Sequence, residues 1–217
     1  ANAYLTDPIR VETAPPGKPA DKIDQGIHFV EQSAKSKLLI SYLDKHRDDQ
    51  ALVFSRTKHG AERLMKALAN AGFAASSIHG NKSQGQRDRA IVAFKAGDLR
   101  VLVATDVAAR GLDIPGVRYV YNYDLPNVPD NYVHRIGRTA RAGRDGTAIA
   151  FCSPDEMSEL RAIEKTMGKA IPILGGTEWE PVGGFKGAKK PGGRPGGNGN
   201  RNRRQGKPGG HRSRRAA

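Results

Sequence analysis

The four residues Val101-Leu102-Val103-Ala104 decide the fold of this chain, because they are apolar without alternation. A strand with one face in water shows apolar residues at alternate positions, whereas a strand covered on both faces is apolar throughout. The run therefore predicts a strand inside a parallel sheet that carries helices on both faces. A polar segment, Thr105–Asp113, follows directly and contains a hydroxyl, an arginine and two carboxylates among small side chains.

Strands and helices are predicted to alternate on both sides of this run. Short apolar runs predict further strands near residues 27–30, 51–55, 74–78, 117–121 and 147–152. Apolar residues at helical spacing follow most of them, and capping boxes that begin at Ser83 and Ser153 predict the starts of two helices. The alternation predicts an α/β fold with three layers, α/β/α, and a mostly parallel sheet.

The charge of the chain is uneven along its length. It carries 36 Lys and Arg against 22 Asp and Glu, a net charge of +14, and residues 181–217 hold eleven Lys or Arg and no acid. We expect a connector over residues 1–22, one domain over 23–174 and a disordered basic tail rich in Gly, Lys and Arg over 175–217. Such a tail would attract nucleic-acid phosphates, with a solubilising role as the weaker alternative.

Cysteine usage and hydropathy point to a reducing, non-membrane environment. Cys152 is the single cysteine, which excludes an intramolecular disulfide, and its place at the end of an apolar run predicts a buried thiol. We find neither a signal-peptide pattern nor an apolar run as long as a membrane span, so a cytoplasmic location is predicted. The chain opens with Ala1 and not Met, as expected of a fragment or processed product, methionine removal being the alternative.

A second stretch, His134–Arg141, has the sequence HRIGRTAR. On a helix the three-residue step between Arg135, Arg138 and Arg141 would place all three on one side, with only small residues between them. A guanidinium donates two parallel hydrogen bonds to phosphate oxygens and stays charged near neutral pH. From these residues alone, a phosphate site and a solvated arginine face are equally good interpretations.

The predicted sheet places several polar loops together, yet two common parts of a nucleotide site are missing. Loops that follow parallel strands meet at one edge of the sheet, where ligands bind. The chain has no Gly-x-x-x-x-Gly-Lys-Ser/Thr loop for phosphates, and the Asp-Glu pair that follows a predicted strand, Asp155-Glu156, belongs to the capping box at Ser153, so no such pair is left for a metal ion. Arginines without a phosphate loop predict one half of a composite site.

Taken together, five segments resemble the motifs of the second RecA-like domain of DEAD-box RNA helicases, in the family's order and spacing. They are LVFSRTK at 52–58, Gln84-x-x-Arg87, ATDVAARGLDI at 104–114, YDLP at 123–126 and HRIGRTAR at 134–141. The resemblance covers about residues 23–170 and implies a RecA-like fold, and the basic tail is similar to that of the bacterial RhlE-type branch. Ala140 stands where many members have Gly, but it is also small, so we expect no loss of function.

The resemblance also implies roles for individual residues. Arg138 and Arg141 would reach the γ-phosphate of ATP as arginine fingers, and Asp113 would contact the ribose, with Gly111 beside it. Contacts to the RNA backbone are implied for Arg56, Thr57, Gln84, Arg87, Thr105 and Gly111. Coupling between domains is implied for Arg110, His134 and Arg135. The phosphate loop and the Mg²⁺ that accompanies ATP would come with an N-terminal RecA-like domain, and no metal site is expected on this chain.

By this resemblance, the chain is the C-terminal half of an enzyme that couples ATP hydrolysis to RNA unwinding, inactive without its N-terminal domain. Its expected partners are RNA, ATP and that domain. A non-catalytic RNA-binding or annealing module is one alternative, but it leaves Arg138, Arg141 and Asp113 without a task. Half of a DNA helicase is another, because backbone contacts alone do not distinguish RNA from DNA.

Overall fold

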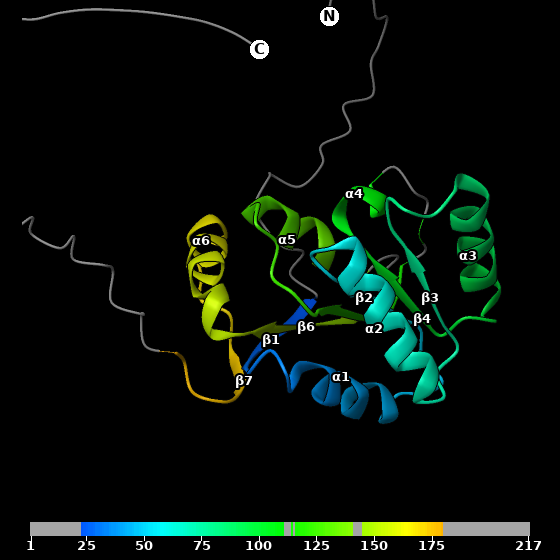
Figure 1. Cartoon of the computed structure of the whole chain (residues 1–217). Helices are drawn as coiled ribbons and strands as arrows, with labels where there is room; N and C mark the ends of the chain where they lie inside the picture. The colour runs from blue at the N-terminus through cyan, green and yellow to red at the C-terminus, as the bar shows by residue number, and fades with distance from the viewer. Residues whose placement is uncertain (1–22, 111–113, 115, 141–144, 180–217) are drawn as a thin grey trace, which may run out of the picture. The chain divides into compact units, whose positions relative to one another are not determined.

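The computed structural model describes residues 23–110, 114, 116–140 and 145–179 (Figure 1). The predicted connector 1–22 and residues 180–217 of the predicted tail lie outside the described residues. The strands are β1 (Ile23–Phe29), β2 (Ala51–Phe54), β3 (Ala75–Ile78), β4 (Val101–Ala104), β5 (Tyr119–Asn122), β6 (Gly146–Cys152) and β7 (Ile173–Gly175). The helices are α1 (Lys35–Asp44), α2 (Lys58–Asn70), α3 (Gln84–Ala96), α4 (Asp106–Ala109), α5 (Pro129–Ile136) and α6 (Met157–Met167), with a 3₁₀ turn at Pro154–Glu156.

The strands form one sheet in the order β3-β4-β2-β5-β6-β1-β7, and every pairing between named strands is parallel. This confirms the prediction of a mostly parallel sheet. The deciding strand, β4, lies between β3 and β2 and is at most 1% exposed at each of its four residues. The edge strand β7 was not predicted, because it is only 3 residues long and its Ile173 and Leu174 are half exposed.

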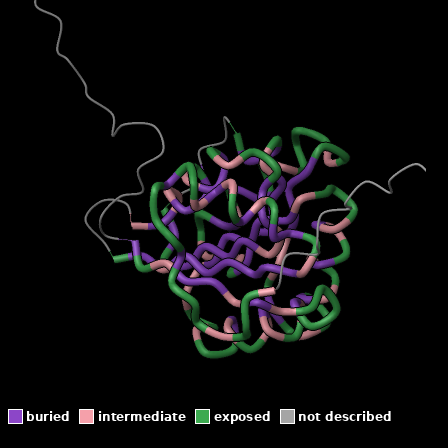
Figure 2. The backbone as a smooth tube through the Cα atoms, turned by 90° about the vertical axis from the view of Figure 1, so that its left-hand side faces the viewer, coloured by how far each residue is buried: buried purple, intermediate pink, exposed green. Residues whose placement is uncertain are grey.

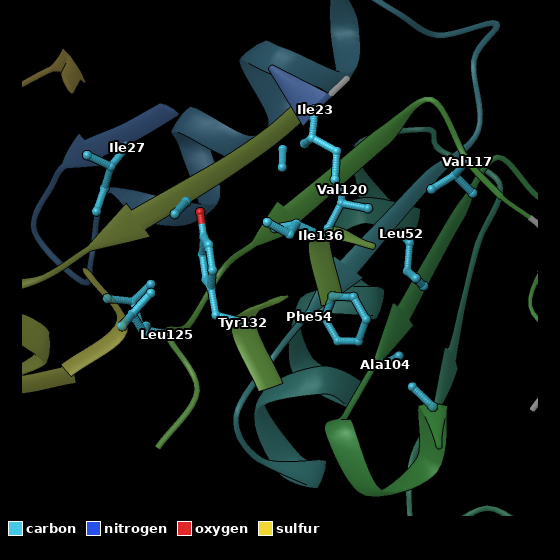
Figure 3. Packing of buried hydrophobic residues seen from close by; sticks show 14 of the residues in the cluster. Ile23, Ile27, Leu52, Phe54, Ala104, Val117, Val120, Leu125, Tyr132 and Ile136 are labelled. Carbon is cyan, nitrogen blue, oxygen red and sulfur yellow. The ribbon is translucent and has the colours of Figure 1, made fainter. Parts of the chain in front are cut away.

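Helices cover both faces of the sheet, as the unbroken apolar character of β4 predicts. Leu39 of α1 and Leu64 of α2 pack with Val53 in one core cluster, whereas the other cluster includes residues of α3, α5 and α6. Figure 3 shows Tyr132 and Ile136 of α5 on this second face, together with Leu52 of β2. The backbone coloured by burial shows the strands as a buried centre beneath partly exposed helices (Figure 2). The α/β/α prediction is confirmed.

Both predicted capping boxes are present. The Ser83 side chain accepts from the Gln86 N–H and the Gln86 side chain accepts from the Ser83 N–H, so α3 begins where predicted. Ser153 and Glu156 form the second box, but there the chain makes a 3₁₀ turn first and α6 begins at Met157. Gly168 ends α6 at φ +68°, a conformation that glycine adopts without strain.

The prediction that three arginines share one side of a helix is wrong. Helix α5 ends at Ile136, and Arg138 follows in a turn, whereas Arg141 lies outside the described residues. The Thr139 hydroxyl lies 2.6 Å from the Val117 carbonyl oxygen and 2.8 Å from that of Arg118. These contacts bind the chain to the segment that enters β5, so the helix cannot continue. The arginines are three residues apart in the sequence, but the helix ends before Arg138, so they do not share one helical face.

Residues just after the predicted domain boundary pack on the fold. The indole N–H of Trp179 donates to the Cys152 carbonyl oxygen at 3.1 Å, and its ring packs against the core. The folded part of the chain therefore includes residues that the boundary at 174 assigns to the tail. Cys152 itself is fully buried, as predicted, and burial raises the pKa of its thiol to about 12.

Candidate functional site

The loops that carry the predicted site residues lie at one edge of the sheet. Because paired strands β2 to β6 are all parallel, the loops after Phe54, Ile78, Ala104 and Asn122 leave the sheet at the same edge. Carboxyl ends of parallel strands are where open α/β sheets bind ligands. Two cavities open here, and each is lined by a different group of the predicted residues.

The smaller cavity, which we call the arginine cavity, has a volume of about 280 Å³. Its lining consists of Phe54, Asp106, Ala109, Arg110, Asn131, His134, Arg135 and Arg138. The structure thus brings together four residues for which nucleotide or coupling roles were predicted, Arg110, His134, Arg135 and Arg138, from two separate segments. Asn131 is a member that the sequence did not predict.

Arg135 is part of the interior and not of an exposed basic surface. Its side chain is 2% exposed, and its Nε and Nη2 donate to the two carboxylate oxygens of Asp106 at 2.6 and 2.8 Å. Its Nη1 donates to Asn122 Oδ1 at 3.0 Å and to the Asp124 carbonyl oxygen at 2.7 Å, and the guanidinium lies 5.0 Å from the Phe54 ring centre. Arg135 therefore ties together the ends of β2, β4 and β5.

The other basic residues of the arginine cavity are more accessible. Arg110 and His134 are exposed, and Arg138 is partly exposed. The carboxylate of Asp106, the cavity's acid, already binds Arg135 with both oxygens. The remaining donors are positively charged or hold N–H groups, a set that fits phosphate oxygens. Such donors match the phosphate end of a nucleotide, whereas the chain supplies no loop to enclose it.

The larger cavity, about 640 Å³, lies between α1, α2 and the loops after β5 and β6. Its lining includes Arg56 and Thr57, both predicted to contact RNA. The Thr57 side chain caps α2 by accepting from the Gly60 N–H at 2.9 Å. Arg56 Nη2 donates to Glu156 at 2.8 Å, and its Nη1 has no hydrogen-bond partner among the described residues. Arg56 is therefore held at the cavity wall, and its Nη1 donors are left unused within the described residues.

The buried ion pair between Lys35 and Glu156 lies behind this wall, and sequence analysis did not predict it. Lys35 is fully buried and its ammonium donates to Glu156, and to the Tyr123 carbonyl oxygen at 3.0 Å. Glu156 also accepts from the Leu125 N–H at 2.9 Å, so it joins α1 to the loop after β5. The capping box drew attention to Glu156, but Lys35 has no sequence signal that separates it from a surface lysine.

The RNA-contact residues predicted beyond β3 lie outside both cavities. Gln84 and Arg87 are on the first turns of α3, where Gln84 Nε2 donates to Asp88 at 2.7 Å. The loop before them is anchored by Glu62 of α2, which contacts Ser77, His79 and Lys82. These three hydrogen bonds lower the pKa of Glu62 to about 2. The loop between β3 and α3 is therefore anchored by an ionised carboxylate.

Thr105 is 7% exposed and stands at the N-cap of α4, where its side chain makes no capping hydrogen bond. Three other predicted site residues, Gly111, Asp113 and Arg141, lie outside the described residues. Within residues 23–179, leaving those gaps aside, no group of three or more His, Cys, Asp or Glu is arranged to hold a metal ion. In the same part of the chain no helix is long and apolar enough to cross a membrane.

Comparison with known proteins identifies the family. The model of the helicase conserved C-terminal domain matches residues 34–143. Over 73% of this chain, the ATP-dependent RNA helicase CshA of Listeria monocytogenes is 47% identical, and the DEAD-box ATP-dependent RNA helicase CshA of Bacillus subtilis is 46% identical over 76%. The matched segments are 30% and 34% of those relatives, so the chain spans about a third of their length.

Solved structures agree with the fold. The E. coli DEAD-box protein SrmB, bound to the regulator of ribonuclease activity A, superimposes with a TM-score of 0.67 at 38% identity, over 71% of this chain and 91% of that one. S. cerevisiae Dbp5 bound to RNA and ADP BeF3 gives 0.67 at 35% identity, over 72% and 42%. The RhlE-type branch stays a prediction. The fold, the matched motifs and these relatives together show that the chain belongs to the helicase C-terminal domain family, as the RecA-like C-terminal domain of a DEAD-box protein.

Proposed function

We propose that this chain acts as the C-terminal half of an ATP-dependent RNA helicase. The observation that carries the proposal is the arginine cavity, which is lined by Arg110, His134 and Arg138. The chain has no phosphate loop to complete a nucleotide site there. The larger cavity with Arg56 and Thr57 opens at the same edge of the sheet. One half of a nucleotide site beside one half of a nucleic-acid site is what a two-domain ATP-driven enzyme requires of its second domain.

On the nucleotide side, we assign Arg138 and Arg141 to the γ-phosphate of ATP, and Asp113 and Gly111 to its ribose. The phosphate loop of an N-terminal RecA-like domain would hold ATP with Mg²⁺, and the metal would supply neutralisation of the phosphate charge. The arginines of this chain stabilise the charge that develops on the transferring phosphoryl group. Support comes from the donor set of the arginine cavity and from relatives named as ATP-dependent.

On the RNA side, Arg56, Thr57, Gln84, Arg87, Thr105 and Gly111 contact the phosphate backbone. The free donors of Arg56 and the helix N-termini capped by Thr57 and Ser83 favour anions at this edge. The basic tail adds attraction that is independent of sequence. RNA is favoured as the substrate because the curated relatives are named as RNA helicases and the Dbp5 structure holds RNA.

Coupling between ATP and RNA binding involves Arg110, His134 and Arg135. The two exposed residues and the buried Arg135 have different roles. Arg110 and His134 are exposed at the cavity and act toward the N-terminal domain. Arg135 has all three nitrogens engaged within this domain, so it contributes by holding the cavity wall in place.

We place the enzyme in the cytoplasm, on the support of a buried, unpaired Cys152, which is compatible with a reducing compartment.

A comparison of the chain alone with the two-domain enzyme tests the proposal. The chain alone should hydrolyse no ATP above background with or without RNA, because it holds only the arginine half of the site. The two-domain enzyme should hydrolyse ATP faster with RNA and should separate an RNA duplex more readily than a DNA duplex. Turnover by the purified chain would contradict the composite site. RNA annealing without ATP hydrolysis by the two-domain enzyme would favour the non-catalytic module instead.

A further inference from the structure

Asn131 is a buried polar residue at the arginine cavity to which no motif assigns a role. It lies in the first turn of α5, is 9% exposed, and lines the cavity beside Arg110 and His134. Its side-chain Oδ1 accepts a hydrogen bond from Nη2 of Arg110 at 2.5 Å. The bond joins the start of α5 to the segment after α4, which are 21 residues apart in the chain.

Asn131 is also the acceptor that holds the side chain of Arg110. Arg110 follows the last residue of α4 in extended backbone, and its side chain is exposed. The nearby carboxylate of Asp106 is already engaged by Arg135 through both oxygens. Within the part of the chain that the structure describes, Asn131 is the one side chain that accepts from Arg110. Without it, a long arginine side chain would sample many rotamers in water.

The neutrality of the Asn131 amide matters for what Arg110 can do. A carboxylate in this place would orient the guanidinium but would also compensate its charge, as Asp106 does for Arg135. The uncharged amide oxygen of Asn131 accepts from one nitrogen of Arg110 and leaves the positive charge and the other donors of Arg110 to an anion or to another domain. The geometry therefore restrains Arg110 without neutralising it.

We propose that Asn131 is a positioning residue that holds Arg110 in the orientation required to couple RNA binding to ATP hydrolysis. The inference rests on the proposed function, because Arg110 has its task only in the two-domain enzyme. Losing a restraint on one long side chain weakens an interaction by a modest factor, since the side chain must be ordered again in each cycle. RNA-stimulated turnover of Asn131→Ala should therefore fall about threefold to tenfold.

The experiment is a double-mutant cycle in the two-domain enzyme, with RNA-stimulated ATP turnover and melting temperature as readouts. The variants are Asn131→Ala, Arg110→Ala and both together, with Asn131→Asp retaining an acceptor. Asn127→Ala is the matched control, because Asn127 is exposed and lies just before α5. We expect the double variant to be no slower than Arg110→Ala, since Asn131 acts through Arg110. Asn131→Asp should be slower than wild type, because its carboxylate would compensate the charge of Arg110, and Asn127→Ala should match wild type.

A purely structural role for Asn131 would give a different pattern. The melting temperature would fall in Asn131→Ala, and its effect on turnover would add to that of Arg110→Ala. That result, normal turnover by Asn131→Ala, or an Asn131→Asp variant as fast as wild type would each overturn the inference while the proposed function stands. A wild-type enzyme without RNA-stimulated hydrolysis would overturn both.

Discussion

Substitution of Arg135 by lysine tests the finding that this arginine is a structural tie inside the domain. Lysine keeps the charge, but its ammonium is a single point and cannot reach both Asp106 oxygens while also serving Asn122 and Asp124. At least two of the four hydrogen bonds are then lost, and Asn122, which is fully buried, is left with its oxygen unpaired. Hydrogen bonds to charged groups contribute about 1.5–3 kcal/mol each, and partial rearrangement reduces the total.

We therefore expect Arg135→Lys to lower the free energy of unfolding by about 2–4 kcal/mol. For a domain of this size the melting temperature should fall by roughly 5–15 °C. Thermal and urea unfolding of the chain followed by circular dichroism measures both. Arg118→Lys is the control, because the Arg118 side chain is 64% exposed and its change should stay within about 0.5 kcal/mol. An Arg135→Lys variant as stable as the control would refute the structural role.

Three further outcomes follow from the site. Arg138→Lys in the two-domain enzyme should slow ATP turnover at saturating ATP and RNA on the order of 10³-fold without changing the melting curve, and near-normal turnover would return Arg138 to a solvated surface role. Truncation after Trp179 should remove most of the RNA affinity of the chain and flatten its salt dependence, measured by RNA binding across a salt series; an unchanged slope would assign the affinity to the folded domain. Glu62→Gln should destabilise the domain at pH 7 by on the order of 1–2 kcal/mol, because a pKa lowered to about 2 stabilises the fold above the unfolded pKa. That difference should disappear as the pH falls from about 4.5 to 2, and a pH-independent difference in urea unfolding would contradict the ionic role of Glu62.

The sheet could be predicted because its strands depend on local patterns. The unalternating run Val101–Ala104 is at the centre of a parallel sheet, and the boxes at Ser83 and Ser153 each begin a helical segment. These features are written in neighbouring residues, so a single sequence carries them. The strand Ile173–Gly175 has no such pattern, because its pairing with β1 comes from tertiary contact alone.

The residues of the site could be predicted only in part, because their tasks depend on partners distant in sequence. The spacing of Arg135 and Arg138 was visible, but the end of α5 depends on Thr139 contacting Val117, 22 residues away. Burial of Arg135 depends likewise on Asp106, and burial of Lys35 on Glu156, 121 residues along the chain. The sequence does not indicate whether a charged side chain faces water or a buried partner. The structure was therefore needed to separate the buried charged residues from the exposed ones.

Asp124 links the hydrogen bonds of the two cavities, so the contacts of Arg135 extend to the wall that carries Arg56. The Asp124 carbonyl oxygen accepts from Arg135, while its carboxylate Oδ2 accepts from the Ser55 hydroxyl and the Arg56 N–H, both at 2.9 Å. Arg56 in turn faces the larger cavity. Because packed hydrogen-bonded elements shift together and not one atom at a time, loss of the Arg135 contact should also loosen the wall that holds Arg56. The arginine cavity and the larger cavity are therefore parts of one hydrogen-bonded edge, in which the buried Arg135 fixes the geometry and the more exposed arginines line the cavities.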